Sequence, residues 1–199
     1  MSSTLTPSEE SPVSRGSSVA ASAGLGVFAA VIGYLLTYLL VGSEVRETFG
    51  DDIPEWKGVA WYFYEAHMVD IEATSRIGSF GGTRVLDLIG ESSTASADLL
   101  YALPPLVLVA VGAFLALRWT VTDLGDAVVA GAPVTIGYAV VLGLGAVVAE
   151  ANTEASALGI EATGSIGPVL LPAVVLGGIL YPLVFATAGA AIAATVADR

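Results

Sequence analysis

Three neighbouring side chains in the segment 65–70 are of types that bind metals or move protons: Glu65, His67 and Asp70. A divalent metal site needs three or four converging nitrogen or oxygen ligands. On a helix, residues 65 and 67 face nearly opposite ways, whereas His67 and Asp70 share a face. Two ligands fall short of a site, so we expect no metal here. We interpret His67 as part of a hydrogen-bond network between this segment and neighbouring helix ends.

Catalytic chemistry has little support elsewhere in the chain. His67 is the only histidine, and no serine or carboxylate is tied to it by a known motif. The chain has no cysteine, which removes thiol nucleophiles, disulfides and iron–sulfur clusters. We therefore expect no catalytic residue, no cofactor and no enzymatic activity.

The longer segment 54–70 is rich in aromatic side chains. Trp56, Val59, Ala60, Phe63 and His67 follow helical spacing and share one face. Pro54 suits the first turn of such a helix. We expect this helix to lie at the membrane surface or over the spans, with its rings at headgroup depth. It forms a candidate outer docking segment consisting of Trp56, Trp61, Phe63, Tyr64 and His67.

The position of this segment follows from the charge pattern of the 199-residue chain. Only 13% of the residues are charged, and the stretches 16–43, 99–117, 127–149 and 162–197 contain no Asp, Glu, Lys or Arg. This pattern excludes a single soluble domain and predicts membrane spans. We place the spans at about 19–42, 99–119, 127–149 and 168–196, within a membrane domain 19–199.

The predicted fold is all-α, with four transmembrane helices in an up-down bundle. The short link 120–126 requires the second and third spans to form an antiparallel hairpin, and 150–166 is expected to be a loop. Residues 43–98 form an acidic extracytoplasmic insert between the first two helices, in which 71–90 is a loop with room for a short strand or helix. Residues 1–18 are predicted to be a disordered polar tail.

Orientation follows weakly from the basic residues. With the amino terminus inside, Arg15, Arg118 and Arg199 face the cytoplasm, and Arg46 and Arg84 face outward. The link 150–166 has no base, which favours the same orientation. We expect a multi-pass protein of the cell membrane with both termini cytoplasmic.

The net charge of −12 and the single lysine disfavour nucleic acid or anionic lipid as a partner. This balance favours a halophilic acidic protein, since high salt screens the repulsion between carboxylates. An ordinary acidic membrane protein is the alternative. Small residues recur at four-residue spacing in the spans, as in Gly112 and Ala116, which suits close helix packing. The expected partners are the lipid bilayer and a membrane protein or a second copy of the chain.

Polar and helix-breaking residues gather in the third and fourth spans. An interior proline removes a helical hydrogen bond and frees a carbonyl, which transporters use near the midplane. The candidate midplane or hinge site consists of Thr135, Tyr138, Gly177, Gly178, Tyr181 and Pro182. Static kinks and hydrogen bonds between helices are the alternative. The spans contain no charge, which argues against active ion coupling.

The run PEWKGVAWYFYEAHMV, followed later by LLYALPPLVLV, resembles a family of small haloarchaeal membrane proteins of unknown function, some labelled generically as transporters. The likeness extends from the first span onward. It implies a first span, an outer aromatic segment and a span opening on Tyr-x-x-Pro-Pro. Most members carry an amide near Glu65, where this chain has an acid. The matching residues are Trp56, Lys57, Trp61, Phe63, Tyr64, Ala66, His67, Val69, Tyr101, Pro104 and Pro105.

Two classes of function remain open at this point. In the first class, the chain is a small transporter-like or channel-like component that uses the broken fourth span, as the family label suggests. Alternatively, it is a non-catalytic accessory subunit or envelope organiser that docks a partner through the outer aromatic segment.

Overall fold

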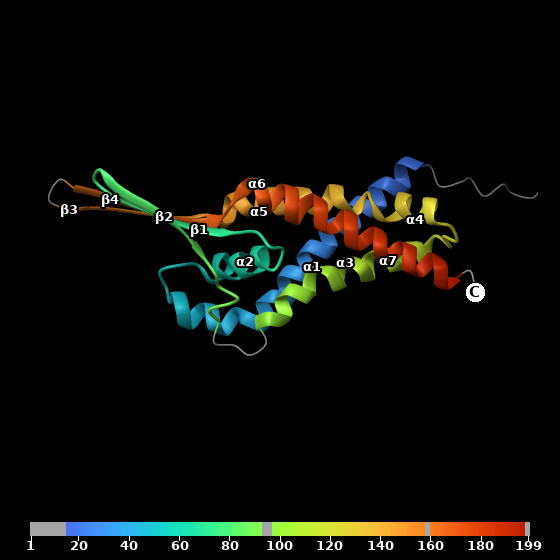
Figure 1. The fold of residues 1–199 in the computed structure, drawn as a ribbon, viewed down its shortest axis with the longest axis horizontal. Coiled ribbons are helices and arrows are strands. Elements are labelled where there is room, and N and C mark those ends of the chain that lie inside the picture. The colour runs from blue at the N-terminus through green and yellow to red at the C-terminus, as the bar shows by residue number, and fades with distance from the viewer. Residues whose placement is uncertain (1–14, 93–96, 158–159, 198–199) are drawn as a thin grey trace, which may run out of the picture.

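The computed structural model describes residues 15–92, 97–157 and 160–197. Four helical segments are long and apolar enough to cross a membrane: Gly16–Phe49, Ala97–Arg118, Leu124–Ala149 and Leu170–Ala197. They lie side by side and alternate in direction (Figure 1), which confirms the prediction of four such helices. The predicted tail lies outside the described residues up to 14, and 15–18 already belong to the first helix.

Each span is built differently. α1 (Arg15–Phe49) is about 52 Å long, more than a bilayer core requires, so its charged last turns extend beyond it. α3 (Leu103–Arg118) follows a 3-10 helix, η1 (Ala97–Ala102), and has prolines in its first turn. The third span joins α4 (Leu124–Gly131) to α5 (Val134–Ala149) at Pro133. The fourth contains α6 (Leu170–Pro172), a π-helix η2 (Ala173–Leu180) and α7 (Tyr181–Ala197).

The bundle consists of two helix pairs in very close contact. A Cβ atom added to Gly112 of α3 would overlap the carbonyl of Ala186 in α7, and one on Gly189 would overlap that of Val109. Gly26 and Gly137 bring α1 and α5 together in the same way. Lipid tails are as apolar as leucine, so membrane helices associate through such close backbone packing.

The prediction of an all-α fold is wrong, because the chain also forms a four-stranded antiparallel sheet in the order β2-β1-β4-β3. The strands are β1 (Ile71–Ile77), β2 (Phe80–Leu86), β3 (Ala151–Ala157) and β4 (Ile160–Pro168). β1 and β4 pair at the centre, with Thr74 opposite Ser165. The sheet projects from one end of the bundle (Figure 1).

Two further expectations change with the sheet. The link 150–166 is not a loop, since it supplies β3 and most of β4. The segment 43–98 does not form a unit of its own, because its β1–β2 hairpin is completed by strands from between the third and fourth spans. A contact between residues about 90 positions apart therefore holds this end of the molecule together.

The predicted aromatic helix is present as α2 (Glu55–Glu65), packed against α1 and α5. Every residue from Gly58 to Glu65 is buried. The helix ends in a Schellman motif, in which Val69 N–H bonds the Tyr64 carbonyl and Met68 N–H bonds that of Glu65. Met68 has φ of 58°, in the left-handed region that normally takes glycine, and it reverses the chain toward β1.

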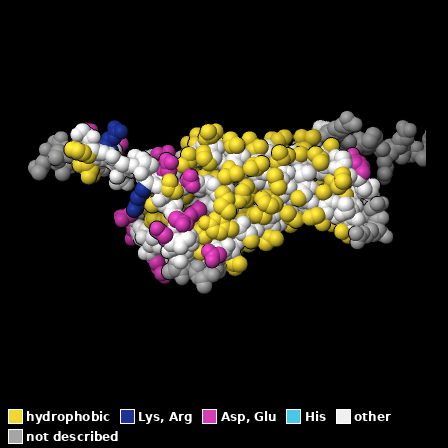
Figure 2. All heavy atoms as spheres, viewed as in Figure 1, with side chains coloured by type: hydrophobic (Ala, Val, Ile, Leu, Met, Phe, Trp, Pro, Cys, Tyr) yellow, Lys and Arg dark blue, Asp and Glu magenta, His cyan; other side chains and the backbone are white. Residues whose placement is uncertain are grey.

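The surface separates by polarity along the long axis. Apolar side chains cover the flank of the four spans, while acidic side chains gather at the end that carries α2 and the sheet (Figure 2). A second, smaller acidic group lies at the opposite end. This belt between polar ends is typical of a protein embedded in a bilayer.

Candidate functional site

α2 runs alongside the second half of α5 in the opposite direction and is tied to it by hydrogen bonds. Lys57 Nζ donates to the Glu150 carbonyl (2.5 Å), and Trp61 Nε1 donates to that of Ala149 (3.0 Å). Farther along, Tyr64 Oη donates to the Leu142 carbonyl (2.5 Å). The outer helix therefore does not lie on the surface but is inserted between α1 and α5, with its carboxyl end directed into the bundle.

His67 stands at that inner end and is fully buried. Its Nδ1 lies 2.6 Å from the Phe63 carbonyl oxygen, which can only accept, so Nδ1 carries the proton. Nε2 then accepts from the Tyr138 hydroxyl of α5 at 2.7 Å. Burial lowers the pKa of His67 to about 4, which keeps the ring neutral and suits this pattern. His67 therefore joins the end of α2 to Tyr138 within α5, rather than to a neighbouring helix end.

The cluster joins the aromatic segment to part of the predicted midplane site. The centroid of the His67 ring lies 5.7 Å from that of the Tyr138 ring and 5.1 Å from that of the Tyr181 ring. A Cβ on Gly177 would lie 2.7 Å from Leu142 Cδ2 and 3.4 Å from His67 Cβ, so a larger residue there would displace the end of the Leu142 side chain. The sequence had placed these residues in two separate sites.

The π-helix that faces this cluster has a local cause. Tyr181 N–H bonds the Leu176 carbonyl five residues earlier, the π-helical pattern. Pro182 has no N–H and would clash with the preceding turn of an α-helix, and a wider turn relieves this. The prolines at 172 and 182 bracket η2, and Gly178 lets it approach Ala139 of α5. The fourth span is thus one continuous helical segment that widens into a π-helix between its two prolines, and a hinge there stays a prediction.

The remaining predicted residues are more dispersed. Pro182 is buried in α7, and the half-buried Thr135 has a hydroxyl with no hydrogen-bond partner among the described residues. Of the docking segment, Trp61, Phe63, Tyr64 and His67 are at most 4% exposed. Only Trp56, at 45%, offers its side chain at the surface.

Sequence reasoning gave no role to Glu65, which anchors the chain after β2. Its Oε2 accepts from the backbone N–H groups of Leu88 and Ile89, at 3.0 and 3.1 Å. Burial, with Asp87 nearby, raises the pKa of Glu65 to about 7, and the two N–H bonds act against that rise. Glu65 therefore fastens the end of the β1–β2 hairpin to α2.

The sheet is the other candidate site. Its sequence indicated strands only weakly, as room for a short strand or helix within 71–90. β2 is exposed from Phe80 to Val85, and β1 from Thr74 to Ile77. Phe80 is 83% exposed and Ile77 61%, and the two pair directly beside the turn at Gly78 and Ser79. The sheet thus carries an apolar tip, and among its described side chains only those nearest the bundle are buried.

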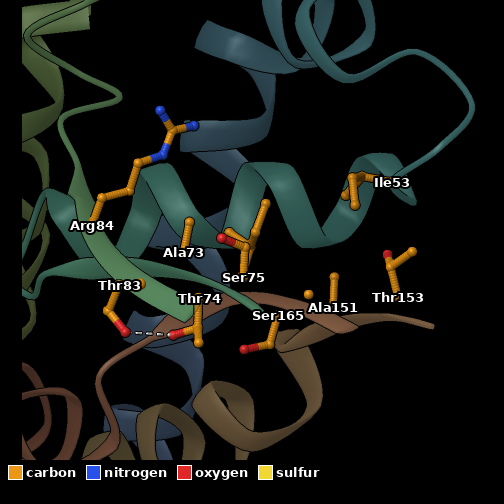
Figure 3. A pocket seen from close by; sticks show the side chains of 12 residues that line it. Ile53, Ala73, Thr74, Ser75, Thr83, Arg84, Ala151, Thr153 and Ser165 are labelled. Carbon is orange, nitrogen blue, oxygen red and sulfur yellow. Dashed lines mark hydrogen bonds between the residues drawn. The ribbon is translucent and has the colours of Figure 1, made fainter. Parts of the chain in front are cut away.

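One face of the sheet is hollowed (Figure 3), with a volume of about 510 Å³. Its floor is a row of small residues directly opposite each other on three strands, Gly82, Ser75 and Gly164. Ile53, which precedes α2, and Arg84 also line it. Thr74 and Thr83 share a hydrogen bond of 3.1 Å beside it.

Within the described ranges, no group of three or more His, Asp or Glu side chains is placed to hold a metal ion. Four of the five hollows that we describe lie on the sheet, and the fifth is a groove between α1, α2 and α5. His67 lines none of them.

Comparison with known proteins gives one match. A family described as "Family of unknown function (DUF7978)" matches residues 1–197. No curated protein and no solved structure matches the chain.

Proposed function

Because the chain belongs to DUF7978, a family of unknown function, we propose its role from its own geometry. It is a membrane-embedded docking subunit that presents its four-stranded sheet to a partner protein. The partner adds an extended strand along the open edge of β2. The observation that carries this proposal is a sheet exposed on its faces and at its edges, held at one end of the bundle.

The chemistry of the β2 edge favours strand addition. Exposed edges are usually protected by lysine, proline, bulges or short length. β2 has seven residues, no proline, and Arg84 as its one charge. Gly81 and Gly82 leave little side-chain bulk along it, and Phe80 adds an apolar anchor at the tip. Main-chain bonds along such an edge supply affinity, and side-chain pockets supply specificity.

The register identifies which backbone groups are open. The turn Gly78–Ser79 has two residues, with positive φ at Gly78 only, as in a type II′ hairpin. A two-residue turn closes on a hydrogen-bonded pair, here Ile77 and Phe80, and the bonded pairs alternate from there. The N–H and C=O groups of Gly81, Thr83 and Val85 therefore point away from β1 to the open edge.

The bundle provides the rigid support for this role. β4 leads directly into α6, and Val169 N–H between them bonds the Asp70 carbonyl just before β1. α2 holds both hairpins, since Trp61 bonds the Ala149 carbonyl before β3 and Glu65 bonds the chain after β2. The acidic surface at the sheet end supports the further proposal that the protein works at high salt, as in a haloarchaeon, with the sheet outside the cell.

The test is purification of the tagged protein from its native membrane in mild detergent at high salt. We expect one protein to co-purify in near-stoichiometric amount. Thr83→Pro removes an edge-facing N–H and should abolish this association, since proline is tolerated on edge strands but cannot donate. Thr83→Val is the matched control, because it loses only the bond to Thr74. A monodisperse chain with no companion, or a companion that Thr83→Pro retains, contradicts the proposal.

A second candidate, passage of a small solute through the bundle, is favoured by the π-helix between Pro172 and Pro182. It also suits the family label of transporter that the sequence suggests. Solute flux into vesicles containing the purified protein, reduced by Gly178→Ala, would favour this role over docking.

A further inference from the structure

A second surface feature lies on the side of the bundle, away from the sheet. α1 and α5 touch closely at Gly26 and Gly137, and nearer the sheet α2 packs against both of them. A groove of about 190 Å³ remains where the three helices meet. Residues on its walls include Val31, Tyr34, Trp56, Phe63, Gly145 and Val148.

The groove lies at membrane depth and is apolar. Its α1 and α5 walls come from the charge-free parts of two candidate spans. Its hydroxyl groups are already satisfied, because Tyr34 Oη donates to the Trp56 carbonyl and Tyr64 Oη to that of Leu142. Val31 and Val148 are 43% and 58% exposed, so the groove opens onto the apolar belt. A molecule bound in the groove would therefore interact with its walls through dispersion contacts. If the groove were empty, the side chains that line it would lack these contacts.

A cation stands at the end of this groove nearest the sheet. Lys57, the only lysine of the chain, lies with Nζ 5.4 Å from the centroid of the Trp56 ring and bonds the carbonyl of Glu150, which follows the groove residue Ala149. An ammonium group has three donors, and this carbonyl takes one. An indole beside a lysine at the end of a span is typical of headgroup depth.

We propose that this groove binds one phospholipid, with one of its hydrocarbon chains between α1 and α5 and its phosphate on Lys57. The apolar walls fit the chain, and the charge of Lys57 complements the phosphate. The sheet takes no part in this site, so the proposal stands independently of the docking function.

The test counts phospholipid phosphorus in protein purified in detergent and washed free of bulk lipid. We expect about one phospholipid per chain. Val148→Phe fills the groove from its lipid-facing wall and should reduce this several-fold. Val147→Phe is the matched control, because Val147 is equally exposed but does not line the groove, and it should retain the lipid. Equal retention by the two variants would overturn the proposal.

The headgroup contact is tested with Lys57→Gln. This variant should bind phospholipid several-fold more weakly, while binding of diacylglycerol with the same chains stays unchanged. An equal loss of both lipids, or no loss, would overturn the assignment of the phosphate to Lys57. If Val148→Phe fails to fold, quenching of Trp56 fluorescence in a Trp119→Phe background replaces it, with one equivalent of chain-brominated phospholipid added in detergent so that no bulk lipid reaches the ring. Trp61 is fully buried, so absence of quenching would overturn the proposal.

Discussion

At the scale of single residues, His67 joins three elements that are distant in the sequence. It bonds α2 through Phe63 and α5 through Tyr138, and it packs against Tyr181 of α7. Its participation in a hydrogen-bond network could be predicted, since it is the only histidine and sits in an aromatic helix. Its partners outside α2, Tyr138 and Tyr181, could not, because they lie 71 or more positions away and no local pattern specifies such contacts.

The neutral state of His67 has a consequence for stability. Its pKa falls from 6.5 to about 4 on folding, so the unfolded chain binds more protons between these values. The stability that His67 contributes should be complete above pH 6.5 and decline as the pH falls toward 4. Glu65, with its pKa raised to about 7, has the opposite trend, so wild type must be compared with a variant that keeps Glu65.

We therefore expect His67→Gln to lower the unfolding temperature at pH 8. The loss of a buried hydrogen bond should reduce the free energy of unfolding by about 1–3 kcal/mol. This deficit should shrink as the pH is lowered from 6.5 to 4, because the glutamine does not titrate. Thermal unfolding in detergent at a series of pH values measures both effects. A deficit that is constant with pH would show that His67 is not held neutral.

At the scale of elements, the spans were predictable and the sheet was not. Charge-free stretches locate membrane helices because a buried charge is costly in lipid, so the predicted spans end within a few residues of α3 and α5. Strands are usually found by alternation of apolar and polar residues, which reflects one buried face. The side chains of β1 and β2 are exposed on both faces at their outer ends. The Ser, Thr, Ala and Gly residues of the four strands show no such alternation.

The helix pairs give a sharp prediction. Gly112→Ala places a methyl group against the Ala186 carbonyl, so α3 and α7 must separate. We expect a loss of about 1–3 kcal/mol, as for other overpacked cores. Gly24→Ala is the control, because nothing lies within 4 Å of that position in α1, and alanine should stabilise the helix by up to about 1 kcal/mol. Unfolding in detergent compares them, and a Gly112→Ala protein as stable as Gly24→Ala would refute the close pairing.

At the scale of the whole molecule, charge and topology point to one orientation. The alternating helices place the start of α1, the α3–α4 link and the end of α7 at one end of the bundle, and the sheet at the other (Figure 1). Arg15 and Arg118 belong to the end opposite the sheet and Arg199 follows α7 in the sequence, whereas Arg46 and Arg84 belong to the sheet end. Basic residues near spans favour the cytoplasm, so the sheet is expected outside.

The absence of cysteine makes this orientation directly testable with single substitutions. Ser75→Cys places a thiol on the exposed sheet, and Thr122→Cys places one on the exposed α3–α4 link. A membrane-impermeant maleimide added to intact cells should label the first and not the second, and permeabilised cells should show both. The unsubstituted chain is the blank. Labelling of Thr122→Cys alone would invert the orientation, and labelling of both in intact cells would mean that the intervening helices do not separate two compartments.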